Sequence, residues 1–159
     1  MPRRHGLLTE QQIKVLKLRA KGLSLRDVAS ILGVSHQNVA LIEKRALRNV
    51  KVAEQTLLVY KLITSPVKLV IKEGTRLVEI PKIVIEASDS AGVRVRGDFT
   101  LLFKLLRFRA RECVRGVRLE KPVLVIVNPQ GYVDVYPYHE VKHVYESLVV
   151  HSEDRGKSA

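Results

Sequence analysis

Residues 24–46 read SLRDVASILGVSHQNVALIEKRA and carry the signals for two helices joined by a tight turn. Ser24, followed three residues later by Asp27, is a helix start, because its hydroxyl and the carboxylate can each accept a hydrogen bond from a free backbone N–H group. Gly33 can adopt the left-handed conformation that ends a helix. Ser35 is then placed to cap the next helix. The stretch therefore predicts a helix, a turn and a second helix.

These two helices match a helix-turn-helix motif position by position. With Leu25 as position one, the small Ala29 falls at five, Gly33 at nine and Val39 at fifteen. A small residue is needed where the second helix crosses the first, and glycine takes the positive φ of the turn. No proline interrupts either helix. The side chains expected to face inward are Val28, Ala29, Ile31, Leu32, Val34, Val39 and Ile42.

Helical patterns extend on both sides of the motif. Thr9 and Gln12 form another start signal, which precedes an apolar repeat ended by Gly22. That repeat consists of Ile13, Leu16 and Ala20. Beyond the motif, spacings of three and four residues relate Val39, Ile42, Ala46, Val50, Ala53, Leu57 and Tyr60. This seam predicts a third helix that is either long or briefly broken near Asn49.

The outward face of the third helix carries residue types that recognise DNA bases. In a helix-turn-helix the second helix of the motif enters the major groove, while the first braces on the backbone. Amides such as Gln37 and Asn38 pair with an adenine edge, although one of them can instead cap the helix. We expect base contacts from Ser35, His36, Gln37, Asn38, Ala40, Leu41 and Lys44. We expect phosphate contacts from Ser24, Arg26, Arg45 and Arg48. For each arginine the alternative is a solvated surface charge.

The charge of the chain agrees with a polyanionic partner. Its 159 residues include 28 Lys and Arg against 16 Asp and Glu, a formal net charge of +12. Residues 1–65 hold 12 basic and 4 acidic side chains, and residues 94–121 hold 9 and 3. Such an excess favours nucleic acid as the partner. The charged surface of a thermophilic protein is the alternative, but it predicts balanced signs.

Residues 7–57, LLTEQQIKVLKLRAKGLSLRDVASILGVSHQNVALIEKRALRNVKVAEQTL, resemble the archaeal Tfx family of DNA-binding proteins. The resemblance is carried by "LT", "Q" and "VL" in the first helix, by "GLS" and "VA", and by "LGVS", "NV", "IEKRA" and "T" beyond them. This half is also similar to the helix-turn-helix of region four of bacterial sigma factors. EGTRLVEIPKIVIEASDSAGVRV and RGVRLEKPVLVIVNPQGYVDVY resemble the C-terminal domain of the family. The resemblance covers about residues 7–136, and the tail from residue 137 departs from the family pattern.

The resemblance implies a transcriptional regulator from an archaeon. Carried onto this chain, the DNA-reading face of the family falls on His36, Gln37, Asn38, Leu41, Lys44 and Arg45. The alternative from another class is an effector-binding or enzymatic α+β module that uses the helix-turn-helix only for docking.

The second half of the chain predicts a small α+β domain. Thr64-Ser65-Pro66 breaks the helical seam and gives the expected boundary. The order that follows is a strand over 67–71, a helix from Pro81 to about Ser90, a strand at 93–95, a helix capped by Asp98 and ended by Gly116, and a hairpin over 123–136. The apolar face of the 98–116 helix is expected to hold Phe99, Leu102, Leu106, Ala110, Cys113 and Val117. The fold class is thus α+β, with an all-α helix-turn-helix domain first.

A basic stripe is expected on the helix over 98–116. It consists of Lys104, Arg107, Arg111, Arg115 and Arg118. Three hypotheses for this stripe remain: it contacts DNA that flanks the recognised site, it binds a small anionic effector, or it is a solvated surface.

The sequence predicts no catalytic, cofactor or metal site. His139-Glu140-Val141-Lys142-His143 spells the H-E-x-x-H pattern of zinc peptidases, but little chain follows to supply a third ligand and a cleft. The single cysteine, Cys113, is expected to be a buried structural thiol. No glycine-rich phosphate loop and no nucleophile elbow is present.

The expected organisation is a DNA-binding domain over 1–65, an α+β domain over 66–136 for dimerisation or effector binding, and a partly helical extension over 137–159 with a disordered end. We expect a homodimer on double-stranded DNA, because paired half-sites add specificity to one short helix. Apolar runs such as 123–127 are too short to span a membrane, and no signal peptide is apparent. A cytoplasmic location is therefore expected.

Overall fold

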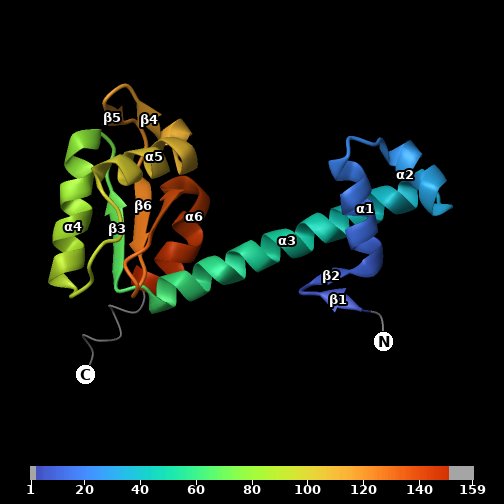
Figure 1. Cartoon of the computed structure of the whole chain (residues 1–159), viewed down its shortest axis with the longest axis horizontal. Coiled ribbons are helices and arrows are strands. Elements are labelled where there is room, and N and C mark those ends of the chain that lie inside the picture. The colour runs from blue at the N-terminus through green and yellow to red at the C-terminus, as the bar shows by residue number, and fades with distance from the viewer. Residues whose placement is uncertain (1–2, 151–159) are drawn as a thin grey trace. The chain divides into compact units, whose positions relative to one another are not determined.

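A computed structural model describes residues 3–150 of the chain. The chain divides into two compact units, residues 1–58 and 59–159, and the division falls within the long helix α3 (Figure 1). The expected disorder at the end of the chain concerns residues 151–159, which lie outside the described residues.

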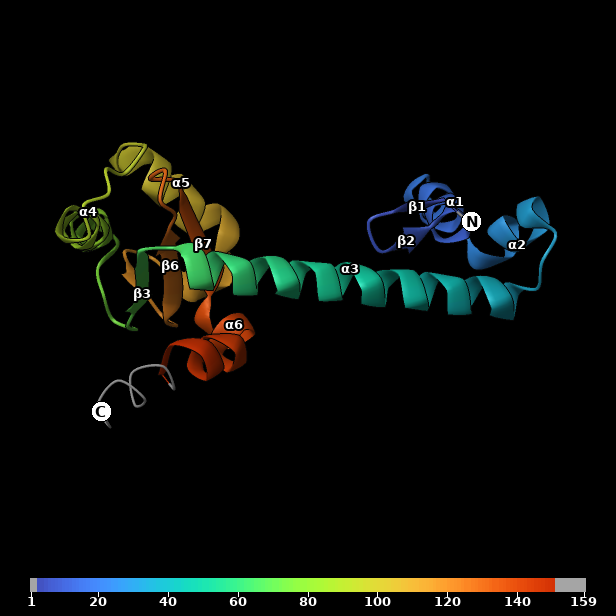
Figure 2. The same ribbon diagram turned by 90° about the horizontal axis from the view of Figure 1, so that it is seen from below.

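The first unit is a small helical domain built on the predicted motif. It contains a short antiparallel hairpin, β1 (Arg4–His5) and β2 (Leu8–Thr9), followed by α1 (Glu10–Ala20), α2 (Leu25–Leu32) and the start of α3 (His36–Thr64). Its buried core consists of Val15, Val28, Ala29, Val39 and Ile42. The helices begin and end where the cap residues predicted them. Figure 2 shows α3 as one continuous helix, so the interruption considered near Asn49 does not occur.

Some inward-facing predictions in the first unit are wrong. Ile31 is 59% exposed, and in α1 the buried residue is Val15 rather than a member of the predicted repeat. The α3 seam is buried only as far as Ala46, whereas Ala53, Leu57 and Tyr60 are exposed. The reason is that the core cluster of the first unit includes only Val39 and Ile42 from α3.

The second unit is built on a three-stranded antiparallel sheet in the order β3–β6–β7. The strands are β3 (Val67–Ile71), β6 (Val123–Val127) and β7 (Val133–Pro137), with Val67 opposite Val127 and Leu124 opposite Tyr136. Every residue of β6 is buried, as expected for a central strand covered on both faces.

Helices cover both faces of this sheet (Figure 2). The main core joins one face to α4 (Ile80–Ser90) and α5 (Phe99–Arg109) through Ile80, Val84, Leu102 and Leu106. Helix α6 (Tyr138–Tyr145), continued by a π-helical turn, η3 (Glu146–Val150), packs on the sheet from the other side. Two 3₁₀ turns, η1 (Leu77–Glu79) and η2 (Arg111–Cys113), and a hairpin of β4 (Val114–Arg115) and β5 (Arg118–Leu119) complete the unit. The α+β class is confirmed.

Two element predictions in the second unit are wrong. Residues 93–95 form no strand, because the backbone bonds here do not build a ladder: the Val93 N–H donates to the Ser88 carbonyl at 2.8 Å, and the Arg96 N–H donates to the Gly131 carbonyl at 2.8 Å. The alternation of Val93 and Val95 with arginines reflects half-burial against the core, not a strand ladder.

The second error concerns the helix expected over 98–116. It ends at Arg109, and the chain continues through η2 into the β4–β5 hairpin. The predicted apolar face holds for Leu102, Leu106, Ala110 and Cys113, but Phe99 and Val117 are exposed. An apolar spacing of three or four residues fits a tight turn as well as a helix, so it did not reveal where the helix ends.

Within the described residues, no helix is long and apolar enough to cross a membrane.

Candidate nucleic-acid interface

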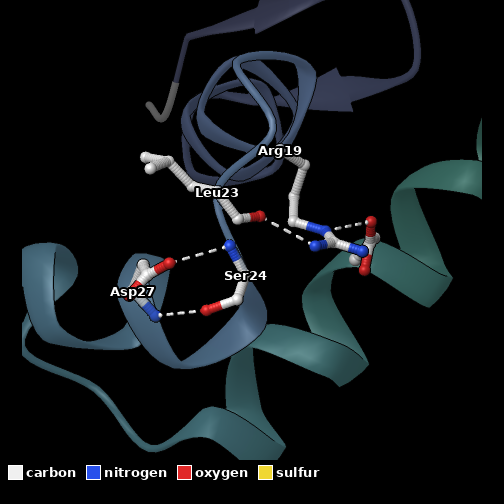
Figure 3. Close-up of polar contacts among 5 residues, drawn as sticks. Arg19, Leu23, Ser24 and Asp27 are labelled. Carbon is white, nitrogen blue, oxygen red and sulfur yellow. Dashed lines mark hydrogen bonds and ion pairs between the residues drawn. The ribbon is translucent and has the colours of Figure 1, made fainter.

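Helix α2 starts at a fully formed capping box. The Asp27 backbone N–H donates to the Ser24 hydroxyl at 3.1 Å, and the Ser24 backbone N–H donates to the Asp27 carboxylate at 3.0 Å (Figure 3). Hydrogen bonds from Ser24, first from its side chain and then from its backbone, lower the pKa of Asp27. The capping box thus fixes the backbone at the N-terminus of α2, where the motif begins.

The turn between α2 and α3 depends on Gly33. Its φ of 67° lies in the left-handed region, and the next amide, of Val34, donates to the Ala29 carbonyl at 3.1 Å. The Ser35 hydroxyl then accepts from the backbone N–H of Asn38 at 3.2 Å. Ser35 is therefore the helix cap, and the amide side chains of Gln37 and Asn38 are not needed for that role.

Arg19 joins α1 to α3, a contact that sequence reasoning missed. Its Nε lies 2.9 Å from Glu43 Oε1, and its Nη1 donates to the Leu23 carbonyl at 2.8 Å (Figure 3). The guanidinium thus links α1, on which Arg19 lies, to two other segments of the first unit, the α1–α2 connection and α3. Arg19 and Glu43 lie 24 residues apart in the chain. The available signal was that Glu43 is the one acidic residue between 36 and 53.

The exposed face of α3 lies opposite the buried one. Val39, Ile42 and Ala46 point into the core. Spacings of four, three and four residues place Gln37, Leu41, Lys44 and Arg48 together on the outer face. Asn38 and Arg45, seven residues apart, share one flank of it. Of the predicted base-contacting residues, all are exposed except Ala40, which is half-buried.

The cations of this surface have no partner in the described part of the chain. Within residues 3–150, no ion pair or side-chain hydrogen bond engages the four basic residues assigned to DNA, Arg26, Lys44, Arg45 and Arg48. All four are exposed. The nearby acidic side chain, Glu43, is engaged by Arg19. The surface therefore keeps positive charge that an anionic partner can neutralise.

The predicted basic stripe in the second unit is divided between elements. Lys104 and Arg107 lie on α5 and Arg111 on η2, whereas Arg115 and Arg118 lie on the β4–β5 hairpin. Two of the five have partners in the fold: Arg115 pairs with Glu120 at 3.1 Å, and Arg118 donates to the Gly74 carbonyl at 2.9 Å. The structure thus brings Lys104, Arg107 and Arg111 together around two adjoining hollows. Arg115 and Arg118 differ from them because each already has a partner in the fold.

Within residues 3–150, the two histidines of the H-E-x-x-H segment do not come together in one ligand cluster. In the part of the chain that the structure describes, Glu112, His139 and Glu140 form the one cluster whose ligand atoms lie within 4.8 Å of one another, and all three are exposed. His139 Nε2 lies 3.5 Å from Glu112 Oε1. The second histidine of the pattern, His143, is not part of the cluster. Cys113 is buried, and burial, followed by the charge of Glu112, raises the pKa of its thiol.

Comparisons with known proteins agree with the resemblance noted in the sequence. A family model described as "DNA-binding protein, TFX, C-term" matches residues 53–135. A Methanocaldococcus jannaschii protein named "Putative transcriptional regulatory protein MJ0173" is 39% identical over 130 residues, which cover 82% of this chain and 95% of that protein. The "DNA-binding protein Tfx" of Methanothermobacter marburgensis is 37% identical over 103 residues, or 65% of this chain and 75% of that one.

Proposed function

Because the chain belongs to the Tfx family of DNA-binding proteins, we propose that it is a transcriptional regulator that reads the major groove of DNA with the first turns of α3. Its relatives are named as regulators and DNA-binding proteins, not as enzymes. The observation that carries the proposal is the outer face of α3, which combines amides with basic side chains that have no partner within residues 3–150. An α-helix fits the width of the major groove, and its N-terminal turns reach the bases.

Base recognition is assigned to the exposed side chains at the start of α3. Gln37 and Asn38 offer a donor and an acceptor each, which suits the paired contact with adenine. Leu41, 44% exposed on the same face as Gln37, suits a thymine methyl group. His36 can donate to a base edge or a phosphate. Ala40 and Lys44 complete the predicted set, and Ser35 contributes mainly by capping the helix.

Phosphate binding is assigned to the basic residues around this face. Arg45 and Arg48 follow the base-reading turns, and Ser24 and Arg26 open α2, where backbone N–H groups of a helix start favour an anion. These contacts would fix the position of α3 on the duplex and give affinity without sequence preference.

We expect the protein to act as a homodimer, and α3 offers a surface for this. Val50, Ala53 and Leu57 follow one another at spacings of three and four residues and continue the face that is buried up to Ala46. Ala53 and Leu57 are exposed, and Val50 is half-buried. An exposed apolar helix face of this spacing can pack against the same face of a second copy. Two copies would read two half-sites.

The test is selection of binding sites from a pool of random duplexes by the purified protein. The proposal expects one enriched sequence that consists of two related half-sites, whose centres lie about one helical turn or a multiple of it apart. Enrichment of no sequence above the starting pool would contradict sequence-specific binding. Enrichment of an isolated half-site would contradict the dimer.

A further inference from the structure

The second unit contains a hollow of about 450 Å³ that the proposed DNA-binding surface does not use. It is bordered by η1, α5 and the β4–β5 hairpin, and all its lining residues belong to this unit. Sites for small molecules usually have volumes of roughly 300–1,000 Å³. The hollow is therefore large enough for a small organic ligand.

The walls of the hollow are mainly apolar. Leu77 and Val78 come from η1, Phe103 from α5, and Val117 from the tip of the hairpin. Val78 is 58% exposed and Val117 is 68% exposed, although both are aliphatic. Covering such side chains removes apolar surface from water, which favours a ligand with a hydrocarbon body.

The lining of the hollow also includes two cations. Lys104 and Arg107, three residues apart on α5, line it, and Arg107 also lines an adjoining hollow together with Arg111. Within residues 3–150 none of these three cations forms an ion pair or donates a side-chain hydrogen bond, unlike Arg115 and Arg118. Among the described residues, no acidic side chain lines either hollow. The charge of these three cations is thus left for an anion.

We propose that this hollow binds a small organic carboxylate with an apolar alkyl or aryl body. The carboxylate would pair with the Arg107 guanidinium, which matches it with two parallel N–H donors, and Lys104 would add a second positive charge. The body of the ligand would lie against Phe103, Val78 and Val117. This inference does not rest on DNA binding, because every residue in it lies in the second unit.

The chemistry of the lining argues against more polar anions. Of the residues that the structure describes, Thr100 is the one with an uncharged hydroxyl or amide side chain in the hollow. A sugar phosphate or nucleotide would leave most of its hydroxyl groups without partners there, which costs affinity. Inorganic phosphate would leave the apolar walls uncovered. A carboxylate with a single apolar body can pair with the cations and also cover the apolar walls.

The test is a titration of the full-length protein with octanoate and with phenylbutyrate, followed by two-dimensional amide NMR. We expect saturable shifts of the amides of residues 100–107 and 116–117. Octanol, phenylbutanol and inorganic phosphate are the matched probes, because each lacks either the carboxylate or the apolar body. They should bind at least about tenfold more weakly, since a charge-assisted pair or the apolar contact is missing.

Variants then test the assigned residues. Arg107→Gln should weaken binding of both carboxylates at least about tenfold, because it removes the charged fork. Val117→Ser should weaken carboxylate binding, because it removes an apolar contact. The substitution should leave the fold intact, because the Val117 side chain is exposed. Arg109→Gln is the matched control, since Arg109 lies on the same helix but does not line the hollow. This variant should bind both carboxylates as tightly as the parent protein does.

Each of four results would overturn the proposal. The first is the absence of saturable shifts with both carboxylates, and the second is equal binding of the alcohols or of phosphate. The third is a loss in Arg109→Gln as large as that in Arg107→Gln. Weaker duplex binding by Arg107→Gln, without any carboxylate binding, would assign this patch to flanking DNA instead and would also overturn it.

Discussion

At the scale of single residues, the first unit separates side chains that hold the motif from side chains that are free for a partner. Arg19 contacts Glu43 and the Leu23 carbonyl, so it positions α1 against α3. Gln37 and Arg45 have no such contact within residues 3–150 and are exposed. Sequence reasoning assigned the exposed residues, because helical spacing alone places them outside. It missed the Arg19–Glu43 pair, because a lone acidic residue in that stretch does not identify a partner 24 positions away.

Gln37 and Arg45 should respond differently to truncation. Gln37→Ala should lower the discrimination between the selected sequence and its single-base variants by about 1–3 kcal/mol, the value of one paired base contact. Arg45→Ala should weaken binding to all sequences alike, because a phosphate contact carries no sequence information. The measurement is fluorescence anisotropy with a set of labelled duplexes at one salt concentration. The reverse pattern would show that the two roles are wrongly assigned.

Asp27 should titrate below its ordinary pKa of 3.8, because Ser24 hydrogen-bonds to its charged form. Ser24→Ala should raise this pKa toward the ordinary value, and Ser35→Ala, which caps a different helix, should leave it unchanged. A pKa lowered in the folded state adds stability above the unfolded value, and this contribution is lost as the pH falls through the folded value. NMR titration of the Asp27 carboxyl carbon checks both variants. An unshifted pKa in the parent protein would show that the capping box does not form in solution.

At the scale of elements, local signals predicted where helices begin. Where α5 ends depends instead on tertiary contacts. The starts of α1, α2 and α3 follow from Thr9, Ser24 and Ser35, because a cap acts through bonds within three residues. The end of α5 at Arg109 did not follow from its sequence. Ala110 and Cys113 are buried as the helical spacing required, but a 3₁₀ turn delivers them.

The exposed part of α3 gives a prediction at this scale. Leu57→Asp should convert the dimer to a monomer, because it places a charge in the proposed seam between two copies. Since Leu57 is 53% exposed within one chain, the monomer itself should keep its fold. Val52→Asp is the matched control, because Val52 is 47% exposed on the same helix but lies off this face.

Sedimentation equilibrium of the parent and both variants measures the outcome, and helical content is checked by circular dichroism. A parent protein that is already monomeric, or a dimer that survives Leu57→Asp, would refute this seam. Equal dissociation by Val52→Asp would show that the effect is not specific to the face.

At the scale of the whole molecule, the order of elements gave the α+β class, but not the pairing of distant charges. The hairpin over 123–136 and the strand over 67–71 were predicted from short local patterns. Their assembly into the order β3–β6–β7 was not, and neither was the ion pair of Lys61 with Asp134 at 2.8 Å, which ties the last turns of α3 to β7. Burial acts against the charge of Lys61, but the bonds to Asp134 and Tyr136 outweigh it, so the pKa of Lys61 is raised.

The most direct test of DNA binding through α3 is the salt dependence of duplex affinity for the parent protein and for Arg45→Ala/Arg48→Ala. Lys72→Ala/Lys121→Ala is the control, since it removes two exposed charges from the second unit. We predict a slope of about −4 or steeper for log affinity against log salt in the parent dimer, and a shallower slope only in the α3 double variant, because each lost phosphate contact reduces the ions released. A flat response in the parent protein, or an unchanged slope in the α3 double variant, would contradict the account.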